Sequence, residues 1–325
     1  MEPTLDAVGV GNAIVDVIAT VDHDFIDAHD LMKGAMTLID AERATSLYEV
    51  MPPGIEASGG SAANTVAGMA NFGDRVAYIG KVRDDQLGEV FVHDMRAGGV
   101  TFDVPPAADG PPTARCLIQV TPDAERTLNT FLGISAHLEP DDVDDELVAS
   151  AAITYCEGYL WDRDSAKAAI RRAMDVAHDA GRLVSMTLSD GFCVDRHRAE
   201  WLDLLADRVG LVFANEVEIC SLFETDDFDR ARAQITEMVD ICALTRSEKG
   251  SVVVRGDETH VVPAAVVDTV VDTTGAGDLY AAGFLHGLAI GAPLDRCAEL
   301  GSLAAAEIIS HVGARPLVDL AELAG

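Results

Sequence analysis

The chain has 325 residues, and its 23 Lys and Arg against 55 Asp and Glu give a formal net charge of −32. Hydrophobic residues make up 49% of the sequence, enough for a sizeable core, so an intrinsically disordered acidic protein is excluded. The negative charge argues against nucleic acid and anionic membranes as partners, because both require basic patches on the protein. High-salt adaptation and plain solubility both remain open as explanations of the charge.

The sequence predicts a cytoplasmic protein. The first residues have neither a cationic start nor a long apolar run, so no secretory signal is expected. The longest apolar stretch, 281–294, is too short to span a bilayer. Six cysteines are dispersed without a C-x-x-C pair, which favours reduced thiols, and the absence of an H-E-x-x-H motif disfavours a zinc site.

The first half of the chain mixes strand and helix signals. Strand candidates occur at 7–11 and 14–21, but Gly9-Val10-Gly11 lacks the third glycine and the following helix of a dinucleotide-binding fingerprint. Small residues over 58–72 predict a helix. Alternating residues at 114–120, between proline-rich turns, indicate an antiparallel hairpin.

From about residue 147 onward, apolar strand candidates alternate with helical stretches, which predicts right-handed β-α-β units and a parallel sheet. We expect one α/β domain over 1–325, with a small β-rich lid formed by roughly 12–40 and 100–131. The remaining strand candidates are 76–80, 152–155, 183–186, 211–214 and 241–244, and a hairpin at 251–255 and 259–263 precedes helices at 277–290 and 294–310.

The strongest chemical feature is Asp272-Thr273-Thr274-Gly275-Ala276-Gly277-Asp278, which leads into an apolar helix. Its glycines permit a tight turn in which successive N–H groups point at one anion, and the helix start adds its positive dipole end. A carboxylate beside an anion site suits a base for a hydroxyl that attacks a phosphoryl group. The alternative is a glycine turn with an Asp N-cap, but two Asp residues bracketing the turn favour phosphoryl transfer.

Other phosphate and hydrolase chemistries lack their residues. The chain has no G-x-x-x-x-G-K-[ST] loop and none of the H-R-D or D-F-G elements of protein kinases. Residues 59–63 lack the last glycine of a G-x-S-x-G nucleophile elbow. Kinase chemistry without a P-loop is therefore the interpretation that the motifs support.

Three segments resemble signatures of the ribokinase-like (PfkB) family of sugar and nucleoside kinases, in that family's order. Segment 272–278 is similar to the carboxy-terminal signature, 59–64 to the glycine-pair motif, and 215–218 to the N-x-x-E motif. The similarity extends from Val8 to about Pro316 and implies a ribokinase-like fold, with a central mostly parallel sheet flanked by helices and a small lid. Segments 9–16, 24–27, 185–189 and 213–216 resemble the adenosine kinase branch in particular.

The resemblance also implies roles for individual residues. Asp278 would be the catalytic base, and the N–H groups of Gly275, Ala276 and Gly277 would form the anion hole for the γ-phosphoryl of ATP. The sugar would bind to Asn12, Asp16, Gly60, Ser61 and Asn64, with Met36 and Leu38 lining a base pocket from the lid. Asn215 and Glu218 would organise Mg²⁺ and its waters, and Thr245 and Gly250 would lie along the nucleotide site. Asp272 and Thr274 match positions that hold a monovalent cation in several relatives, so K⁺ activation is a hypothesis.

Most of these residues also have ordinary structural interpretations. Asn12 and Asp16 could stabilise a turn and a strand edge, and the Ser58 segment could be a helix N-cap with small residues for close packing. Residues 215–218 could be a solvated helix start, and Met36 and Leu38 are common core residue types. Arg115 fits either a phosphate contact or an exposed surface position.

The expected function is ATP-dependent transfer of a phosphoryl group to the 5′-hydroxyl of a nucleoside, with adenosine favoured. A sugar kinase of the ribokinase or fructokinase type is the alternative, because Glu157, in an otherwise aromatic segment, departs from the adenosine kinase pattern. A non-catalytic nucleoside-binding regulator is disfavoured by the intact Asp278 and its glycine loop. The expected partner is a small molecule, and a monomer is favoured over a homodimer.

Overall fold

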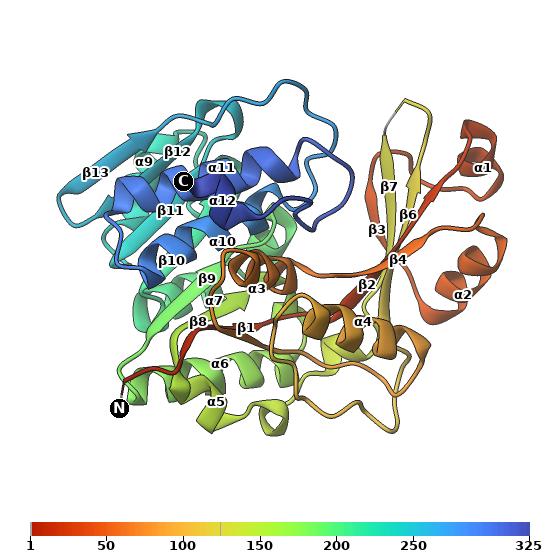
Figure 1. Ribbon diagram of the computed structural model, residues 1–325, viewed down its shortest axis with the longest axis horizontal. Helices are drawn as coiled ribbons and strands as arrows, with labels where there is room; N and C mark the ends of the chain where they lie inside the picture. Colours follow the sequence, from red (N-terminus) through yellow and green to blue (C-terminus); the bar gives the residue numbers. More distant parts are fainter. Residues whose placement is uncertain (1, 124) are drawn as a thin grey trace.

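The computed structural model describes residues 2–123 and 125–325, which form two sheets side by side (Figure 1). The larger is eight-stranded, in the order β13-β12-β11-β10-β9-β8-β1-β5. Its strands from β5 to β11 run parallel, and β12 and β13 are antiparallel. The predicted mostly parallel sheet is therefore confirmed. Its strands are β1 (Leu5–Val10), β5 (Val76–Ile79), β8 (Ala151–Glu157), β9 (Leu183–Thr187), β10 (Leu211–Asn215), β11 (Ile241–Thr245), β12 (Ser251–Arg255) and β13 (Glu258–Val262).

Helices cover both faces of this sheet. Side chains alternate along each strand, so Val8 and Val10 of β1 pack with one group of helices and Ala7 with the other. One layer contains α5 (Asp145–Ser150), α6 (Asp164–Asp179), α7 (Gly191–Arg208), α8 (Glu216–Leu222) and α9 (Phe228–Ile235), and the other contains α3 (Ser61–Asn71), α4 (Gln86–Ala97), α10 (Ala276–Ala289), α11 (Leu294–Ile308) and α12 (Leu320–Ala324). Short 3₁₀ helices lie at Gly133–His137, Pro140–Asp142, Gly158–Asp162 and Ser247–Lys249.

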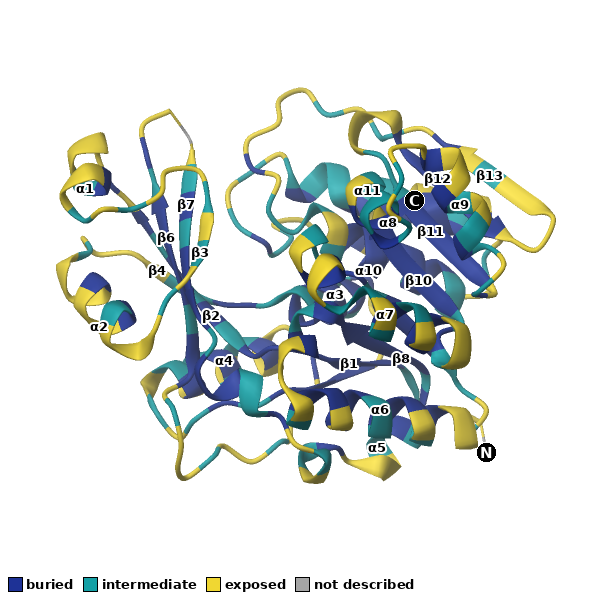
Figure 2. Cartoon of the chain, turned by 180° about the vertical axis from the view of Figure 1, so that it is seen from behind, coloured by how far each residue is buried: buried dark blue, intermediate teal, exposed yellow. Residues whose placement is uncertain are grey.

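The smaller, five-stranded sheet has the order β3-β7-β6-β2-β4. One of its faces packs on helix α2 through Val17, Leu47 and Leu117, and the two helices of this lobe are largely exposed on their outer side (Figure 2). Its elements are β2 (Ile14–Thr20), α1 (His23–Ala28), β3 (Met36–Leu38), α2 (Ala41–Val50), β4 (Ile55–Gly59), β6 (Ala114–Val120) and β7 (Arg126–Phe131).

The boundaries of this lobe differ from those expected for the lid. Helix α2 and strand β4 lie after residue 40, and β4 pairs antiparallel with β2. Residues near 101 and 107 instead make bridges to the larger lobe, to Ala77 and Arg83. Strand β4 carries Glu56, Ala57 and Gly59, which have low strand propensity, so only its pairing with β2 makes this segment a strand.

The first two strands belong to different sheets, although they are almost adjacent in the sequence. β1 ends at Val10 in the larger sheet and β2 begins at Ile14 in the smaller one. Residues 11–13 therefore form a direct covalent connection between the lobes. Among the described residues, no helix is long and apolar enough to cross a membrane.

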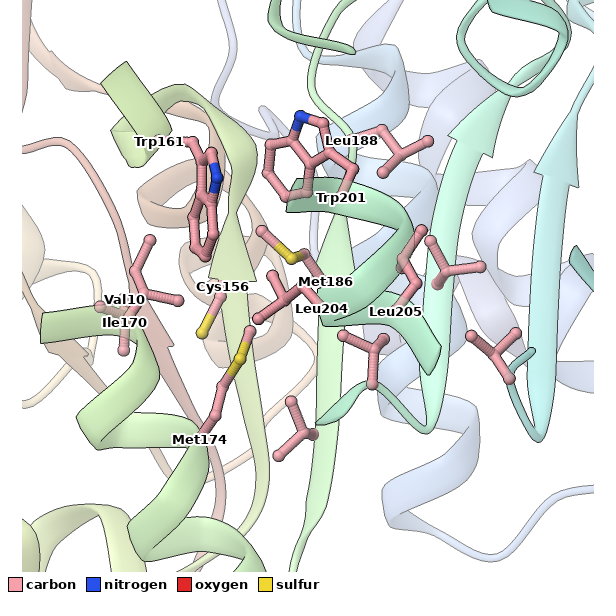
Figure 3. Close-up of a cluster of buried hydrophobic side chains, with 14 of the residues drawn as sticks. Val10, Cys156, Trp161, Ile170, Met174, Met186, Leu188, Trp201, Leu204 and Leu205 are labelled. Atoms are coloured by element: carbon pink, nitrogen blue, oxygen red, sulfur yellow. The ribbon is translucent and has the colours of Figure 1, made fainter. Parts of the chain in front are cut away.

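The core between β8, β9 and helices α6 and α7 contains a stacked tryptophan pair (Figure 3). The rings of Trp161 and Trp201 have centroids 4.9 Å apart and both side chains are fully buried. Trp201 Nε1 also donates to the carbonyl oxygen of Cys193 at 3.1 Å. This pair anchors α7 to the sheet.

We predict that Trp201→Ala lowers the free energy of unfolding by about 3–5 kcal/mol, because it leaves a cavity and removes the ring contact. Urea unfolding followed by circular dichroism measures this change. Phe192→Ala is the matched control, since Phe192 lies on the same helix and is 74% exposed. It should change the free energy of unfolding by no more than about 0.5 kcal/mol. Equal losses in the two variants would contradict the prediction.

Candidate active site

Polar side chains gather at the carboxyl ends of the parallel strands. Glu157 ends β8 opposite Thr187 of β9, and Asn215 ends β10 opposite Thr245 of β11. This is the edge of an open α/β sheet at which ligands bind. The segments that carry the sequence motifs are built around it.

Asp278 contacts two residues of the glycine-pair motif, more than two hundred positions away in the sequence. Its Oδ1 accepts a hydrogen bond from Ser61 Oγ at 2.7 Å, and its Oδ2 accepts one from Asn64 Nδ2 at 2.9 Å. Burial raises the pKa of the Asp278 carboxyl group, while these two donors and nearby Arg315 act in the opposite direction. A carboxylate with a raised pKa, held in a fixed orientation, is suited to accept a proton.

The loop before Asp278 has the backbone shape that an anion site requires. Gly275 has φ +78° and is the N-cap of α10, and a left-handed residue here favours glycine. N–H groups in the first turn of a helix have no acceptor within the helix and are available to a ligand. The Ala276 N–H donates a hydrogen bond to the carbonyl oxygen of Thr273 at 3.3 Å. Gly277 is exposed, and its position leaves open space around it.

Glu157 is fully buried and binds the connection between the lobes. Its Oε1 accepts hydrogen bonds from the Asn12 backbone N–H at 2.8 Å and from Asn12 Nδ2 at 2.6 Å, and its Oε2 accepts one from the Ala62 N–H at 2.8 Å. Asn12 is held further by Tyr78 and Ser135. Glu157 therefore joins the inter-lobe connection to the first turn of α3, a role that sequence reasoning missed.

The remaining sugar-site residues lie around this junction. Gly60 has φ +97°, and a Cβ there would lie 2.3 Å from the carbonyl oxygen of Asn12, so glycine is required. Burial raises the pKa of Asp16 to about 6, with Arg126 and Arg315 opposing the shift. Among the described residues, Asn64 Oδ1 is a buried acceptor with no hydrogen-bond partner. An unpaired buried acceptor can receive a hydrogen bond from a ligand hydroxyl.

Arg315 is a second residue that the motifs did not indicate. It donates to the carbonyl oxygen of Ala63 at 2.8 Å and to Ser58 Oγ at 2.9 Å, which places its charge beneath the start of α3. Burial lowers its pKa to about 10, and the charges of Asp16 and Asp278 oppose this. Arg315 is thus a cation that stabilises both carboxylates of the site. Arg115, by contrast, contacts Thr45 and the Tyr48 ring in the smaller lobe.

The N-x-x-E segment forms a helix cap. Asn215 and Glu218 make a reciprocal capping box at the start of α8. The helix start of the structural interpretation is present, but Glu218 is buried and not solvated. Burial, together with the charges of Asp190 and Asp278, raises the pKa of Glu218 to about 7, and the hydrogen bond from the Asn215 N–H opposes this shift. A divalent cation near these three carboxylates would relieve this repulsion, so they suit Mg²⁺ held through its waters. Residues 2–123 and 125–325 contain no group of three His, Cys, Asp or Glu side chains placed to ligate a metal directly.

The remaining predicted residues lie on or beside strands of the two sheets. Gly250 has φ +85°, and a Cβ there would lie 2.0 Å from the carbonyl oxygen of Val262, so this glycine is required by the β12–β13 hairpin. Thr245 is half-buried at the strand end. Met36 and Leu38 are about half exposed on strand β3 of the smaller sheet, which excludes the core interpretation for them.

Asp272 and Thr274 bind a side chain from the other lobe. Arg126 of β7 donates to Asp272 Oδ2 and, at 2.8 Å, to Thr274 Oγ1. The loops that flank α10 and α11 lie on the side of the larger lobe that faces β7 (Figure 1). Sequence reasoning did not single out Arg126, because the two partners are 146 residues apart.

Sequence and structure comparisons connect this chain to known proteins. The model of the pfkB family of carbohydrate kinases matches residues 51–320. The chain belongs to the pfkB family. The ribokinase-like fold and the family inferred from the motifs are therefore confirmed, and pfkB membership implies kinase activity on a small molecule, with ATP and usually Mg²⁺.

Relatives of this pfkB kinase differ in the substrates for which they are named. The crystal structure of adenosine kinase from Sinorhizobium meliloti is 54% identical, with a TM-score of 0.92 over 98% of each chain. A probable sugar kinase from Rhizobium etli is 50% identical, with a TM-score of 0.93 over 99% of this chain and 98% of that one. A 5-dehydro-2-deoxygluconokinase from Geobacillus kaustophilus is 27% identical over 78% of each chain.

We predict that Glu157 makes the stability of this pfkB kinase depend on pH. Burial raises its pKa from 4.5 to about 7, so the folded chain keeps this proton over a range in which the unfolded chain has released it. The contribution of Glu157 to the free energy of unfolding is therefore fully present below about pH 4.5 and is lost as the pH rises through about 7. The free energy of unfolding changes by at most about 1.4 kcal/mol per pH unit through this group.

Urea unfolding of the wild type and of Glu157→Gln, from about pH 5 to about pH 8, measures this slope. The free energy of unfolding of the wild type should decrease across this range, and the decrease should be smaller in Glu157→Gln. Glu146→Gln, on an exposed position of α5, is the control and should keep the wild-type slope. A Glu157→Gln profile parallel to that of the wild type would refute the assignment.

Proposed function

We propose that this pfkB kinase transfers the γ-phosphoryl group of ATP to the 5′-hydroxyl of a nucleoside, with adenosine as the favoured acceptor. The observation that carries this proposal is a row of apolar side chains across the smaller sheet. Ile18 pairs with Ile55 on one side and with Ile118 on the other, Ile118 pairs with Leu128, and Leu128 pairs with Met36. Residues paired directly across strands project from the same face of a sheet.

This apolar face is turned toward the larger lobe. Asp16, two residues before Ile18 in β2, is close enough to Asp278 for the two charges to interact. Arg126, two residues before Leu128 in β7, reaches Asp272. Side chains two residues apart on a strand project from the same face, so the apolar row lies on the face that carries Asp16 and Arg126. Along the strand direction, Asp16 lies on one side of the row and Arg126 on the other. The opposite face is covered by α2.

An apolar row in this position favours a nucleoside over a free sugar. A free sugar carries hydroxyl groups around its whole ring and would leave them without partners against isoleucine, leucine and methionine side chains. A purine presents flat, weakly polar faces that such side chains can cover. Met36 and Leu38 would belong to this base pocket, and the smaller sheet would act as a lid that closes over it. The name of the Sinorhizobium meliloti relative agrees with this acceptor.

The rest of the site would carry out the transfer. Asn12, Asp16, Gly60 and the free Asn64 Oδ1 would hold ribose hydroxyls near Asp278. Asp278 would take the proton of the 5′-hydroxyl as its oxygen bonds to the γ-phosphorus and the bond to the ADP oxygen breaks. The N–H groups at 275–277 would stabilise charge on the transferred phosphoryl. Asn215 and Glu218 would hold Mg²⁺ through water, and Thr245 and Gly250 would border the nucleotide.

A sugar acceptor is the second candidate, since the Rhizobium etli relative is named a probable sugar kinase. Phosphoryl transfer from labelled ATP to adenosine, guanosine, ribose and fructose, each over a range of concentrations, separates the candidates by kcat/KM. Adenosine should be the best acceptor. Higher kcat/KM for fructose or ribose would replace the proposal with a sugar kinase. Tight adenosine binding without transfer to any acceptor would indicate a regulatory binding protein.

Asp278→Asn should lower kcat at least about 100-fold and leave the Kd for ATP nearly unchanged, because the amide keeps the shape of the carboxylate but cannot accept the proton. Steady-state kinetics and calorimetric ATP titration measure the two quantities. Asp145→Asn, in an exposed ion pair with Arg172, is the control and should keep wild-type kcat. Near-normal turnover by Asp278→Asn would remove Asp278 from the role of base.

Leu128→Gln should raise the KM for the nucleoside about 10-fold or more, since it introduces a polar group in the middle of the apolar row. The KM for ATP should stay within a factor of about two of the wild-type value, because no part of ATP lies against this row in the proposal. Val50→Gln is the control, since Val50 is exposed on the outer helix α2. An unchanged nucleoside KM in Leu128→Gln would exclude the row from the base pocket.

A further inference from the structure

The family resemblance places a monovalent cation at Asp272 and Thr274, and the surroundings of these residues do not fit one. The Asp272 carboxylate already has a donor on each oxygen from the larger lobe itself. Oδ1 accepts from the Thr274 N–H at 3.0 Å, and Oδ2 accepts from the Gly313 N–H at 3.0 Å. The Arg126 guanidinium then adds a charged donor on Oδ2.

The same guanidinium also donates a hydrogen bond to Thr274, the second predicted ligand of the cation. Arg126 Nη1 donates to Thr274 Oγ1 at 2.8 Å, so one nitrogen contacts both residues. The side chains of Arg126 and Asp272 are only 10% and 4% exposed, so the pair is largely shielded from water. A buried carboxylate requires a nearby positive charge, and here the Arg126 guanidinium supplies it.

A metal cation in addition to Arg126 would be unfavourable here. Asp272 carries one negative charge and Arg126 neutralises it, so a second cation would be repelled by the guanidinium at close range. K⁺ would also have to replace its hydration shell with oxygen ligands that now accept hydrogen bonds. Both effects disfavour occupation of the site while Arg126 is in place.

We infer that Arg126 takes the place of the monovalent cation, so that this pfkB kinase neither binds K⁺ at Asp272 nor depends on it. The charge beside the glycine loop then comes from β7 of the smaller sheet. It reaches Asp272 only when that sheet lies against the larger lobe, as it does here. The inference does not depend on which acceptor is phosphorylated, so it can be tested on the protein without substrate.

The test compares thermal unfolding in KCl and in choline chloride at equal ionic strength. The wild type should have the same midpoint in both salts, within about 1 °C. Arg126→Gln exposes the Asp272 carboxylate, and it should be stabilised by K⁺ relative to choline by several degrees at concentrations well above the Kd. Arg115→Gln is the control, because Arg115 also lies in the smaller sheet but contacts Thr45. It should behave as the wild type.

Two outcomes would overturn the inference. A wild-type midpoint raised by K⁺ and not by choline would show that a cation binds despite Arg126. An Arg126→Gln variant that folds but shows no preference for K⁺ would show that Arg126 does not stand in for a cation. If Arg126→Gln does not fold, the unfolding midpoints of the wild type in KCl and in choline chloride still decide whether K⁺ binds despite Arg126. Arg126→Lys, which keeps the charge, then serves as the folded variant and should show no K⁺ preference.

Discussion

The buried carboxylate of Glu157 is the contact on which the geometry of the site depends. It has no exposed surface, so its oxygens need hydrogen-bond donors from the protein, and these come from Asn12 and Ala62. Asn12 lies in one of the connections between the two sheets, and Ala62 lies in the first turn of α3. One side chain at the end of β8 therefore fixes the starting point of the smaller lobe and the position of the helix that carries Ser61 and Asn64.

Asp278 completes this arrangement from the opposite end of the chain. It binds the α3 residues that Glu157 has positioned, so the glycine loop before α10 and the glycine-pair motif come together through side-chain contacts. Desolvation raises the pKa of both carboxyl groups, and each is opposed by a different set of donors. The site thus combines a buried carboxyl group, Glu157, with a half-buried one, Asp278, and hydrogen bonds from backbone, hydroxyl and amide groups set their orientation.

The net charge of −32 bears on how this chain would bind an anion such as ATP. A protein with such an excess of acidic residues binds an anion by concentrating positive potential locally. In this chain the positive groups near the glycine loop are the first turn of α10, Arg126 and Arg315. The two arginines lie close to Asp16, Asp272 and Asp278, so they balance the carboxylates of the site itself.

The sequence by itself determined the parallel sheet, the order of its strands along the chain and the glycine turn before Asp278. These features follow from local signals, because strand alternation, helix starts and left-handed glycines involve neighbouring residues. Only the tertiary structure decided that β4 joins the smaller sheet, that Glu157 binds the inter-lobe connection, and that Arg126 lies on Asp272. These contacts join segments up to 146 residues apart and depend on how the two lobes meet. Periodicity and motifs describe neighbouring residues, so they do not predict how the two lobes contact each other. The folded structure is needed to see these contacts.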